Sequence, residues 1–408
     1  MMSSVRGRLA VATFVSVLVS AAAVRVEAAP FNLTSPVAGT IDDWPTVVAV
    51  DTGFALAWQH YESTGLSSIQ IRRFAADGKP ATTAKAIAAP ANLVGHPRLL
   101  PAYSGKLGLT WLDMQAGLTG TTIEPVTGTV AKPLSLTRPS ATLYDVARLS
   151  NGNIAAAHVY MDVTTPSNPR VRAAVSVAGP SFTTVAKNAK LPLSDNPYTT
   201  SGSQDQAVVG DGAGGALAFY RDRTDRHLYV VKVSSKGVPA TTRTRVSVAT
   251  TYIKAAEMSN YGVRAVRLSD GRYAVAWTST EVSDFSKTGI RLRWLDSTGK
   301  PIGGAVLVNS SLTGVSTSPR LTALSGGRLG IAWIQDEGMT RYHRVRWYAA
   351  AATPLTAVQT LRSDTEVFDL AGLQMTTMKD GRVLQAWRAY DTTLKLYRIR
   401  GEFLTPPK

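Results

Sequence analysis

The feature that most constrains the fold is a pattern that returns seven times between residues 30 and 408. Each copy is a tight-turn sequence followed by a short apolar strand that ends in a large ring, here named the slot residue. Successive slots lie 47 to 61 residues apart without long helical periodicity, a spacing typical of solenoids and propellers. The slot residues are Trp58, Trp111, His158, Phe219, Trp277, Trp333 and Trp387.

The sequences around each slot predict hairpins that are buried on both sides. Residues 269–271 (Ser-Asp-Gly) and 379–381 (Lys-Asp-Gly) place a glycine where a two-residue turn requires a positive φ angle. Residues 273–277 then alternate large Tyr, Val and Trp with small Ala, and in the fourth repeat Ala216 and Ala218 are assigned to the small face. Such strands are predicted to stack around an axis, each bulky face filling the small face of its neighbour.

Each repeat is long enough for four strands, named A to D in chain order. In the sixth repeat they are predicted at residues 319–324, 328–334, 342–348 and about 357–361. The seventh repeat supplies only A, B and C, at residues 370–375, 382–387 and 394–403.

The missing fourth strand is predicted to come from the N-terminal side. Residues 30–35 (Pro-Phe-Asn-Leu-Thr-Ser) resemble the fourth strand at residues 306–310 (Val-Leu-Val-Asn-Ser), so they should complete the last blade. Residues 29–408 are therefore predicted to form a single all-β domain, a seven-bladed β-propeller of four-stranded antiparallel blades closed by the N-terminal strand.

Residues 1–28 read as a secretory signal peptide. Arg6 and Arg8 precede an uncharged run over residues 9–24, and small residues follow before Pro30. The alternative is an uncleaved anchor, but the run falls short of the roughly 20 apolar residues of a spanning helix. The protein is expected to be exported, periplasmic or extracellular, without stable membrane insertion.

Composition excludes several classes of chemistry. The chain has no cysteine, which excludes disulfides, thiolate metal sites and cysteine nucleophiles. Its five histidines form no pair with metal-ligand spacing, and no Gly-x-Ser-x-Gly elbow or phosphate-binding loop occurs. No cofactor or metal is expected. A net charge of +16 favours anionic partners. Nucleic acid is not expected, because the basic positions are spread around a ring and only Trp294 and Trp347 are interleaved with them as stacking aromatics.

The repeats also resemble those of a known group of proteins. Residues 270–277 (Asp-Gly-Arg-Tyr-Ala-Val-Ala-Trp) and 290–301 are similar to repeats of exported bacterial seven-bladed β-propeller proteins. The resemblance implies the fold and no particular activity. Sialidase-type Asp boxes are absent, because Gly271 lies six residues before Trp277, so no catalytic residue can be transferred.

A carboxylate follows every slot by two to four residues. These carboxylates should gather at one end of the propeller, where strand B turns toward strand C. They either cap loop amides and pair with strand C arginines, or some of them bind a ligand at the central mouth. They are Glu62, Asp113, Asp162, Asp222, Glu281, Asp336 and Asp391.

Candidate ligand-binding residues lie at the same end. Strand A contributes Asp42, Asp43, Arg98, Asp145, Asp205, Arg320 and Asp369. The longest loops, in the third to fifth repeats, contribute Tyr198, Tyr252, Asp284, Phe285 and Lys287. Long loops gathered on one face are where binding usually occurs, although simple drift in loop length is the alternative.

Strand C carries repeated cations, with pairs such as Arg72 and Arg73, Arg293 and Arg291, or Arg346 and Arg344. They form either a solvated outer face or a surface that attracts anionic envelope material. We therefore expect an exported noncatalytic binding or interaction scaffold for carbohydrate or anionic envelope material. The alternative is a carbohydrate-active hydrolase or lyase with its site at the central mouth.

Overall fold

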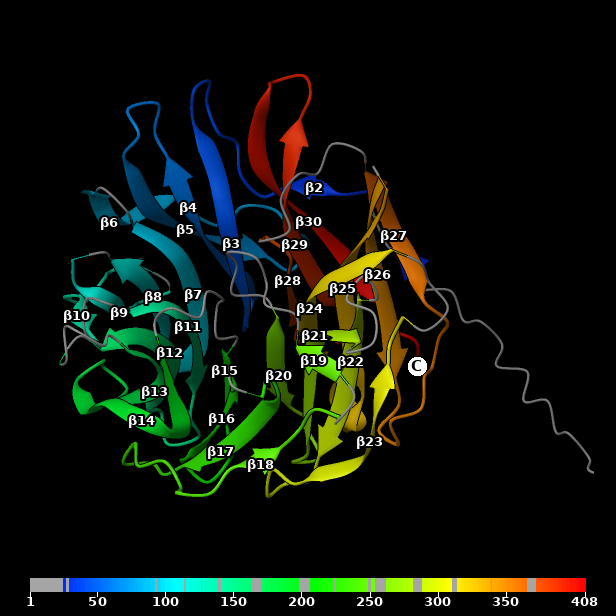
Figure 1. Ribbon diagram of the computed structural model, residues 1–408. Coiled ribbons are helices and arrows are strands. Elements are labelled where there is room, and N and C mark those ends of the chain that lie inside the picture. The colour runs from blue at the N-terminus through cyan, green and yellow to red at the C-terminus, as the bar shows by residue number, and fades with distance from the viewer. Residues whose placement is uncertain are drawn as a thin grey trace, which may run out of the picture.

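The computed structural model describes residues 25–26, 29–91, 94–113, 115–125, 127–137, 141–162, 164, 170–197, 206–222, 225–248, 251–253, 262–281, 288–309, 314–338, 340–364 and 372–408. Their strands form seven antiparallel sheets that stand around a common axis (Figure 1). The predicted seven-bladed β-propeller is confirmed. In the described part of the chain, no helix is long and apolar enough to cross a membrane.

Strand A of each blade lies nearest the axis and strand D lies at the rim (Figure 1). Blade 1 consists of β3 (Ile41–Val50), β4 (Gly53–Tyr61), β5 (Ser67–Ala75) and β6 (Lys85–Ala91). Blade 2 consists of β7 (Val94–Tyr103), β8 (Lys106–Asp113), β9 (Gly117–Ile123) and β10 (Leu134–Ser135). Blade 3 consists of β11 (Ala141–Arg148), β12 (Ile154–Asp162), β13 (Arg170–Ala178) and β14 (Thr184–Pro197).

The remaining blades repeat this order with two variations. Blade 4 consists of β15 (Gln206–Gly210), β16 (Ala216–Arg221), β17 (Leu228–Val233) and β18 (Thr244–Arg245). In blade 5, strand A is split into β19 (Thr251–Ile253) and β20 (Val263–Arg267), followed by β21 (Tyr273–Glu281), β22 (Thr288–Leu295) and β23 (Pro301–Leu307). Blade 6 consists of β24 (Val315–Ala323), a short 3₁₀ turn (Ser325–Gly327), β25 (Leu329–Glu337), β26 (Thr340–Tyr348) and β27 (Gln359–Asp364).

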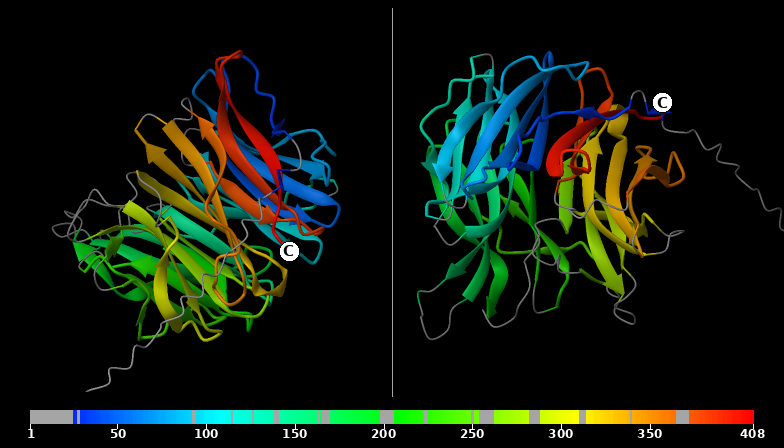
Figure 2. Two further views of the ribbon diagram at one scale, coloured as in Figure 1. Left: turned by 90° about the vertical axis from the view of Figure 1, so that its right-hand side faces the viewer. Right: turned by 90° about the horizontal axis from the view of Figure 1, so that it is seen from above.

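Blade 7 joins the two ends of the described chain. Its strands A to C are β28 (Gln374–Thr377), β29 (Val383–Asp391) and β30 (Leu396–Thr405), and β2 (Phe31–Asn32) pairs with β30 as strand D. Figure 2 shows the red strands of blade 7 beside the blue strands of blade 1. The predicted closure is confirmed. A further pair of residues, β1 (Arg25–Val26), also pairs with β30 and lies within the predicted signal peptide.

One contact fixes strand D to strand C in four blades, and we name it the clasp. An apolar residue donates its amide to a strand C carbonyl, and the next side chain accepts the amide of the same strand C residue. In blade 7, Leu33 donates to Ile399 O at 2.8 Å and Thr34 Oγ1 accepts from Ile399 N at 3.0 Å. The other clasps join Leu136 and Thr137 to Leu118, Val246 and Ser247 to Leu228, and Val308 and Asn309 to Ile290.

Neighbouring blades pack by bulky and small faces, as predicted. The bulky side chains Phe54, Leu56 and Trp58 face blade 7, whereas Ala55 and Ala57 face the bulky side of blade 2. All seven predicted slot residues are buried, with at most 4% of their surface exposed. Because each blade fills the next, the core is a continuous ring around the axis.

In blade 4 the predicted register is wrong by one residue. Ala216 and Ala218 face blade 3, and Tyr220 lies with them in the slot position. Phe219 instead faces blade 5 together with Leu217. The turn explains the shift, because Asp211 N bonds Gly215 O and thereby starts the strand at Ala216. In this strand the face that is bulky in other blades carries two alanines before Tyr220. Residue size alone therefore assigned it to the wrong side.

The clasp in blade 7 predicts a large effect for Leu33→Ala. Leu33 is 1% exposed against Phe54, Ile399 and Phe403, so truncation should lower the free energy of unfolding by about 2 to 4 kcal/mol. Urea denaturation measures the change. Val37→Ala is the control, because Val37 is 67% exposed and should change stability by less than about 0.5 kcal/mol. Equal midpoints for both variants would contradict the closure.

Truncation of the slot residue in blade 6 should lower the free energy of unfolding by a similar amount. Trp333→Ala removes a fully buried indole between blades 5 and 6 and should destabilise the protein by about 3 to 5 kcal/mol. Thermal unfolding followed by tryptophan fluorescence measures it. A well-expressed variant that melts at the wild-type temperature would mean that this packing is misassigned.

Candidate functional site

The loop carboxylates are engaged in structural contacts wherever their side chains are described. Asp113 accepts the amides of Gln115 and Ala116, both at 2.9 Å. The other described contacts join Glu62 to Thr64, Asp162 to Arg172, Asp222 to Arg243, Asp336 to Arg341, and Asp391 to Arg398. The side chain of Glu281 lies outside the described residues. The capping and pairing interpretation is therefore confirmed for Asp113, Asp162, Asp336 and Asp391. Asp222 pairs with an arginine that lies beyond strand C, and Glu62 accepts from a hydroxyl.

Three predicted strand A candidates lie at equivalent positions of blades 2, 3 and 6. Arg98, Asp145 and Arg320 each oppose the strand B residue just before the slot. Asp145 Oδ2 accepts the amide of Val208 in blade 4 at 3.0 Å, and Arg320 Nε donates to the carbonyl of Leu373 in blade 7. Asp145 and Arg320 therefore tie the innermost strands of adjacent blades together. Arg98 is 8% exposed and donates to its own neighbour, Pro97 O.

The other predicted site residues are not tested by the structure. Tyr198, Asp205, Asp284, Phe285 and Lys287 lie outside the described residues, as does Asp369. Tyr252 is in β19, but its side chain is not described. These residues remain predictions.

Strand A is distorted at the same place in three blades. Trp44, His96 and Ser318 have φ angles of 52°, 56° and 58°, and each precedes a proline in a register shift between strands A and B. Left-handed backbone at a non-glycine residue before proline is strained and persists only where the surroundings enforce it. The bulges of blades 1 and 2 bring Trp44 and His96 together, with ring centroids 3.9 Å apart.

Two buried aspartates precede Trp44 in β3. Asp42 Oδ1 accepts from Trp58 Nε1 at 2.9 Å and lies 2.7 Å from His60 Nδ1, and its side chain is 3% exposed. Asp43 Oδ2 lies 2.6 Å from Arg388 Nη1 of blade 7. We name Asp42, Asp43, Trp44, His60, His96 and Arg388 the mouth cluster. It lies where strand A begins and strand B ends, because Ile41 pairs with Tyr61.

The pKa values of the two histidines in the mouth cluster are shifted in opposite directions. Burial, followed by the charge of Arg98, lowers the pKa of His96 to about 4. The hydrogen bond with Asp42 raises the pKa of His60 above its usual value against the opposing effect of burial. Near neutral pH, the ring beside Trp44 is therefore uncharged, whereas His60 is held toward its cationic form beside a carboxylate.

Sequence reasoning identified Asp42 and Asp43 but missed Trp44, His60, His96 and Arg388 as members of one cluster. A usable signal was present, because Trp44-Pro45 and His96-Pro97 interrupt strands that must otherwise pair regularly. Among the described residues, no three His, Asp or Glu side chains gather as a metal site would require.

Comparisons with known proteins show the fold alone. No protein-family model and no curated protein matches this chain. The polysaccharide lyase Uly1 is similar in structure over 96% of this chain and 95% of its own, with a TM-score of 0.54 and 8% identity. A protein of unknown function from Dyadobacter fermentans DSM 18053 matches over 94% and 99% of the two chains, with a TM-score of 0.49 and 12% identity.

The opposite pKa shifts predict opposite pH effects on stability. His96 has a folded pKa below the unfolded value of about 6.5, so its contribution is present above that pH and is lost as the pH falls toward 4. His96→Asn, which tolerates the left-handed backbone, should reduce this acid-side loss by up to about 2 kcal/mol. Urea unfolding between pH 4 and 8 measures the slope.

His60→Gln serves as the comparison of opposite sign. The folded pKa of His60 is raised, so its stabilising contribution is present below about pH 6.5 and is lost as the pH rises through the folded value. The variant should therefore lose most stability at acidic pH. If the stability of the two variants changed with pH in the same way, the environments assigned to His60 and His96 would be wrong.

Proposed function

We propose that the protein binds a carbohydrate chain at the mouth cluster, over blades 7, 1 and 2. The contact between Trp44 and His96 carries this proposal. Both rings are partly exposed, and their strained bulges fix them at the inner edge of the propeller. Large amphipathic rings with an apolar face and a polar edge suit a sugar ring, which itself has apolar and hydroxyl-bearing surfaces.

The polar groups beside the rings are held in place before any ligand arrives. Asp42 is fixed by Trp58 and His60, and Asp43 is fixed by Arg388 and by the amide of Trp44 at 2.6 Å. A preorganised set of donors and acceptors lowers the entropy cost of binding hydroxyl groups. The arrangement therefore favours recognition of a polar, ring-shaped ligand.

The same contacts favour binding over glycoside cleavage. A pair of catalytic carboxylates needs one group free to give a proton and another free to act as base or nucleophile. Both aspartates are instead engaged with cations and N–H donors. A hydrolase or lyase remains the second candidate, with His60 as the group placed to move a proton, and a turnover assay on neutral and acidic polysaccharides distinguishes the two functions.

The strand C arginines support a sugar ligand at the mouth over an anionic partner at the rim. Arg293 and Arg346 donate through Nη1 to the carbonyls of Val246 and Val308 in the preceding blades, at 2.7 and 2.8 Å. Arg72 Nε donates to Thr82 O at 2.8 Å. Arg293 and Arg346 therefore brace neighbouring blades, so fewer of their N–H groups are available to a partner at the rim.

Export of the protein is part of the proposal. It rests on the leader-like residues 1–28, and it places the protein in the periplasm or outside the cell, where polysaccharides are accessible. The structural similarity to a polysaccharide lyase is in keeping with such a ligand.

The decisive variant is Trp44→Ala. A glycan array identifies the ligand, and calorimetric titration with the best-bound glycan should show at least a tenfold loss of affinity, equivalent to about 1.4 kcal/mol. Tyr103→Ala is the matched control, because Tyr103 is a 37% exposed aromatic at the opposite end of β7. Unchanged affinity in Trp44→Ala, or an equal loss in Tyr103→Ala, would place the site elsewhere.

A further inference from the structure

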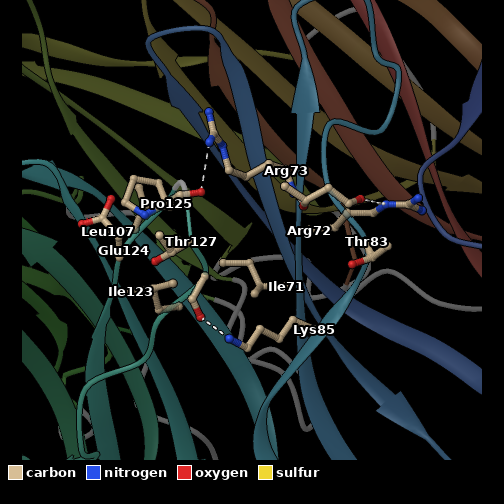
Figure 3. A pocket seen from close by; sticks show the side chains of 12 residues that line it. Ile71, Arg72, Arg73, Thr83, Lys85, Leu107, Ile123, Glu124, Pro125 and Thr127 are labelled. Atoms are coloured by element: carbon tan, nitrogen blue, oxygen red, sulfur yellow. Dashed lines mark hydrogen bonds between the residues drawn. The ribbon is translucent and has the colours of Figure 1, made fainter.

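A pocket lies between blades 1 and 2, away from the mouth cluster. Its cavity volume is about 100 Å³, which is room for several water molecules or one small organic group. Glu124, Pro125, Thr127 and Gly128, which lie between β9 and β10, form one wall (Figure 3). Ile71, Leu107 and Ile123 supply the apolar lining, and Arg73, Lys85 and Glu124 supply the charged groups.

Arg73 lines the pocket at a position where three other blades carry an aromatic residue. Arg73 opposes the strand B residue that lies three positions before the slot. In blades 5, 6 and 7 the equivalent residues are Trp294, Trp347 and Phe403, which are all buried at the interface with the next blade. Trp294, for example, packs edge-on against Tyr348 of blade 6 with ring centroids 5.4 Å apart.

The two cations at the pocket keep unused hydrogen-bond donors. Arg73 Nη1 donates to Pro125 O at 3.0 Å and Nη2 to Thr52 Oγ1, whereas its buried Nε has no hydrogen-bond partner. Lys85 Nζ donates to Gly128 O at 2.7 Å, which uses one of three N–H groups. Figure 3 shows both side chains reaching from blade 1 toward the blade 2 turn.

The charge of the pocket favours an anion. Arg72, Arg73 and Lys85 line it with Glu124 as the one acidic residue of the lining. Within the described part of the chain, neither Arg73 nor Lys85 has a carboxylate in an ion pair, since their recorded contacts are to carbonyl and hydroxyl oxygens. Arg73 is half-buried and Lys85 is exposed at the edge of the pocket. Cations without a counter-charge attract an anion that can accept their remaining N–H groups.

We propose that this pocket binds a small organic carboxylate, with its short apolar chain against Ile71, Leu107 and Ile123 and its carboxylate between Arg73 and Lys85. The size of the pocket limits the ligand to a few carbon atoms. The site is independent of the mouth cluster, because no residue is shared between the two.

Butyrate is the probe, and butan-1-ol is the neutral molecule of matched chain length. Saturation-transfer NMR and thermal-shift titration should detect butyrate with a Kd on the order of 1 mM, and butan-1-ol should bind at least tenfold more weakly. Sulfate tests whether charge alone suffices. Binding of butyrate and butan-1-ol with equal affinity, or no binding of butyrate, would overturn the proposal.

Arg73→Trp is the most informative variant because it introduces the tryptophan that blades 5 and 6 carry at the equivalent position. It should fill the pocket, keep the melting temperature at or above the wild-type value, and weaken butyrate binding at least tenfold. Lys85→Gln should weaken binding without filling the pocket, and Lys379→Gln, at a 75% exposed lysine, should change nothing. A folded Arg73→Trp variant that binds butyrate as the wild type does would contradict the site.

Discussion

The clasp between strands D and C is the contact on which the ring depends. An edge strand leaves a row of amides and carbonyls without partners, and a short strand D can satisfy only some of them. In the clasp, the carbonyl of one strand C residue accepts a backbone amide, and its own amide donates to a side-chain oxygen. Both backbone groups of that residue are thereby paired, and the apolar residue that donates the amide is buried. In blade 7 Leu33 and Thr34 make the same contact with β30, so the ring closes by the contact that also fixes strand D in three other blades.

The fold was predictable because its determinants are periodic. Alternating residue size, glycine turns and slot spacing all repeat, and the likeness of residues 30–35 to residues 306–310 reflects the shared clasp of Leu33 with Thr34 and Val308 with Asn309. The prediction was wrong in blade 4, where the alternation of Ala216 to Phe219 fits either face. There the register is set by a turn contact, Asp211 N to Gly215 O, which sequence periodicity does not encode.

The candidate site was less predictable because it depends on departures from the repeat. The bulges at Trp44 and His96 shift strand register locally, and only the folded blades show that these two rings meet. Conversely, residue types associated with ligand binding serve the scaffold: Asp145 and Arg320 bond neighbouring strands, and the loop carboxylates cap turns. In this propeller a charged residue that recurs in several blades is structural, whereas a residue that breaks the pattern marks a candidate site.

Closure of blade 7 also orders the events of biosynthesis. β2 leaves the ribosome, or any export channel, long before β30, and the other six blades lie between them in the chain. Its partner strand does not exist until the seventh repeat has been made, so β2 must wait without this partner while the intervening sheets form. Contacts between such distant segments fold slowly, because loop closure costs entropy before any pairing compensates. We therefore expect an arc of stacked sheets with one open bulky face as the last intermediate, and this exposed face is the surface that a chaperone would need to cover.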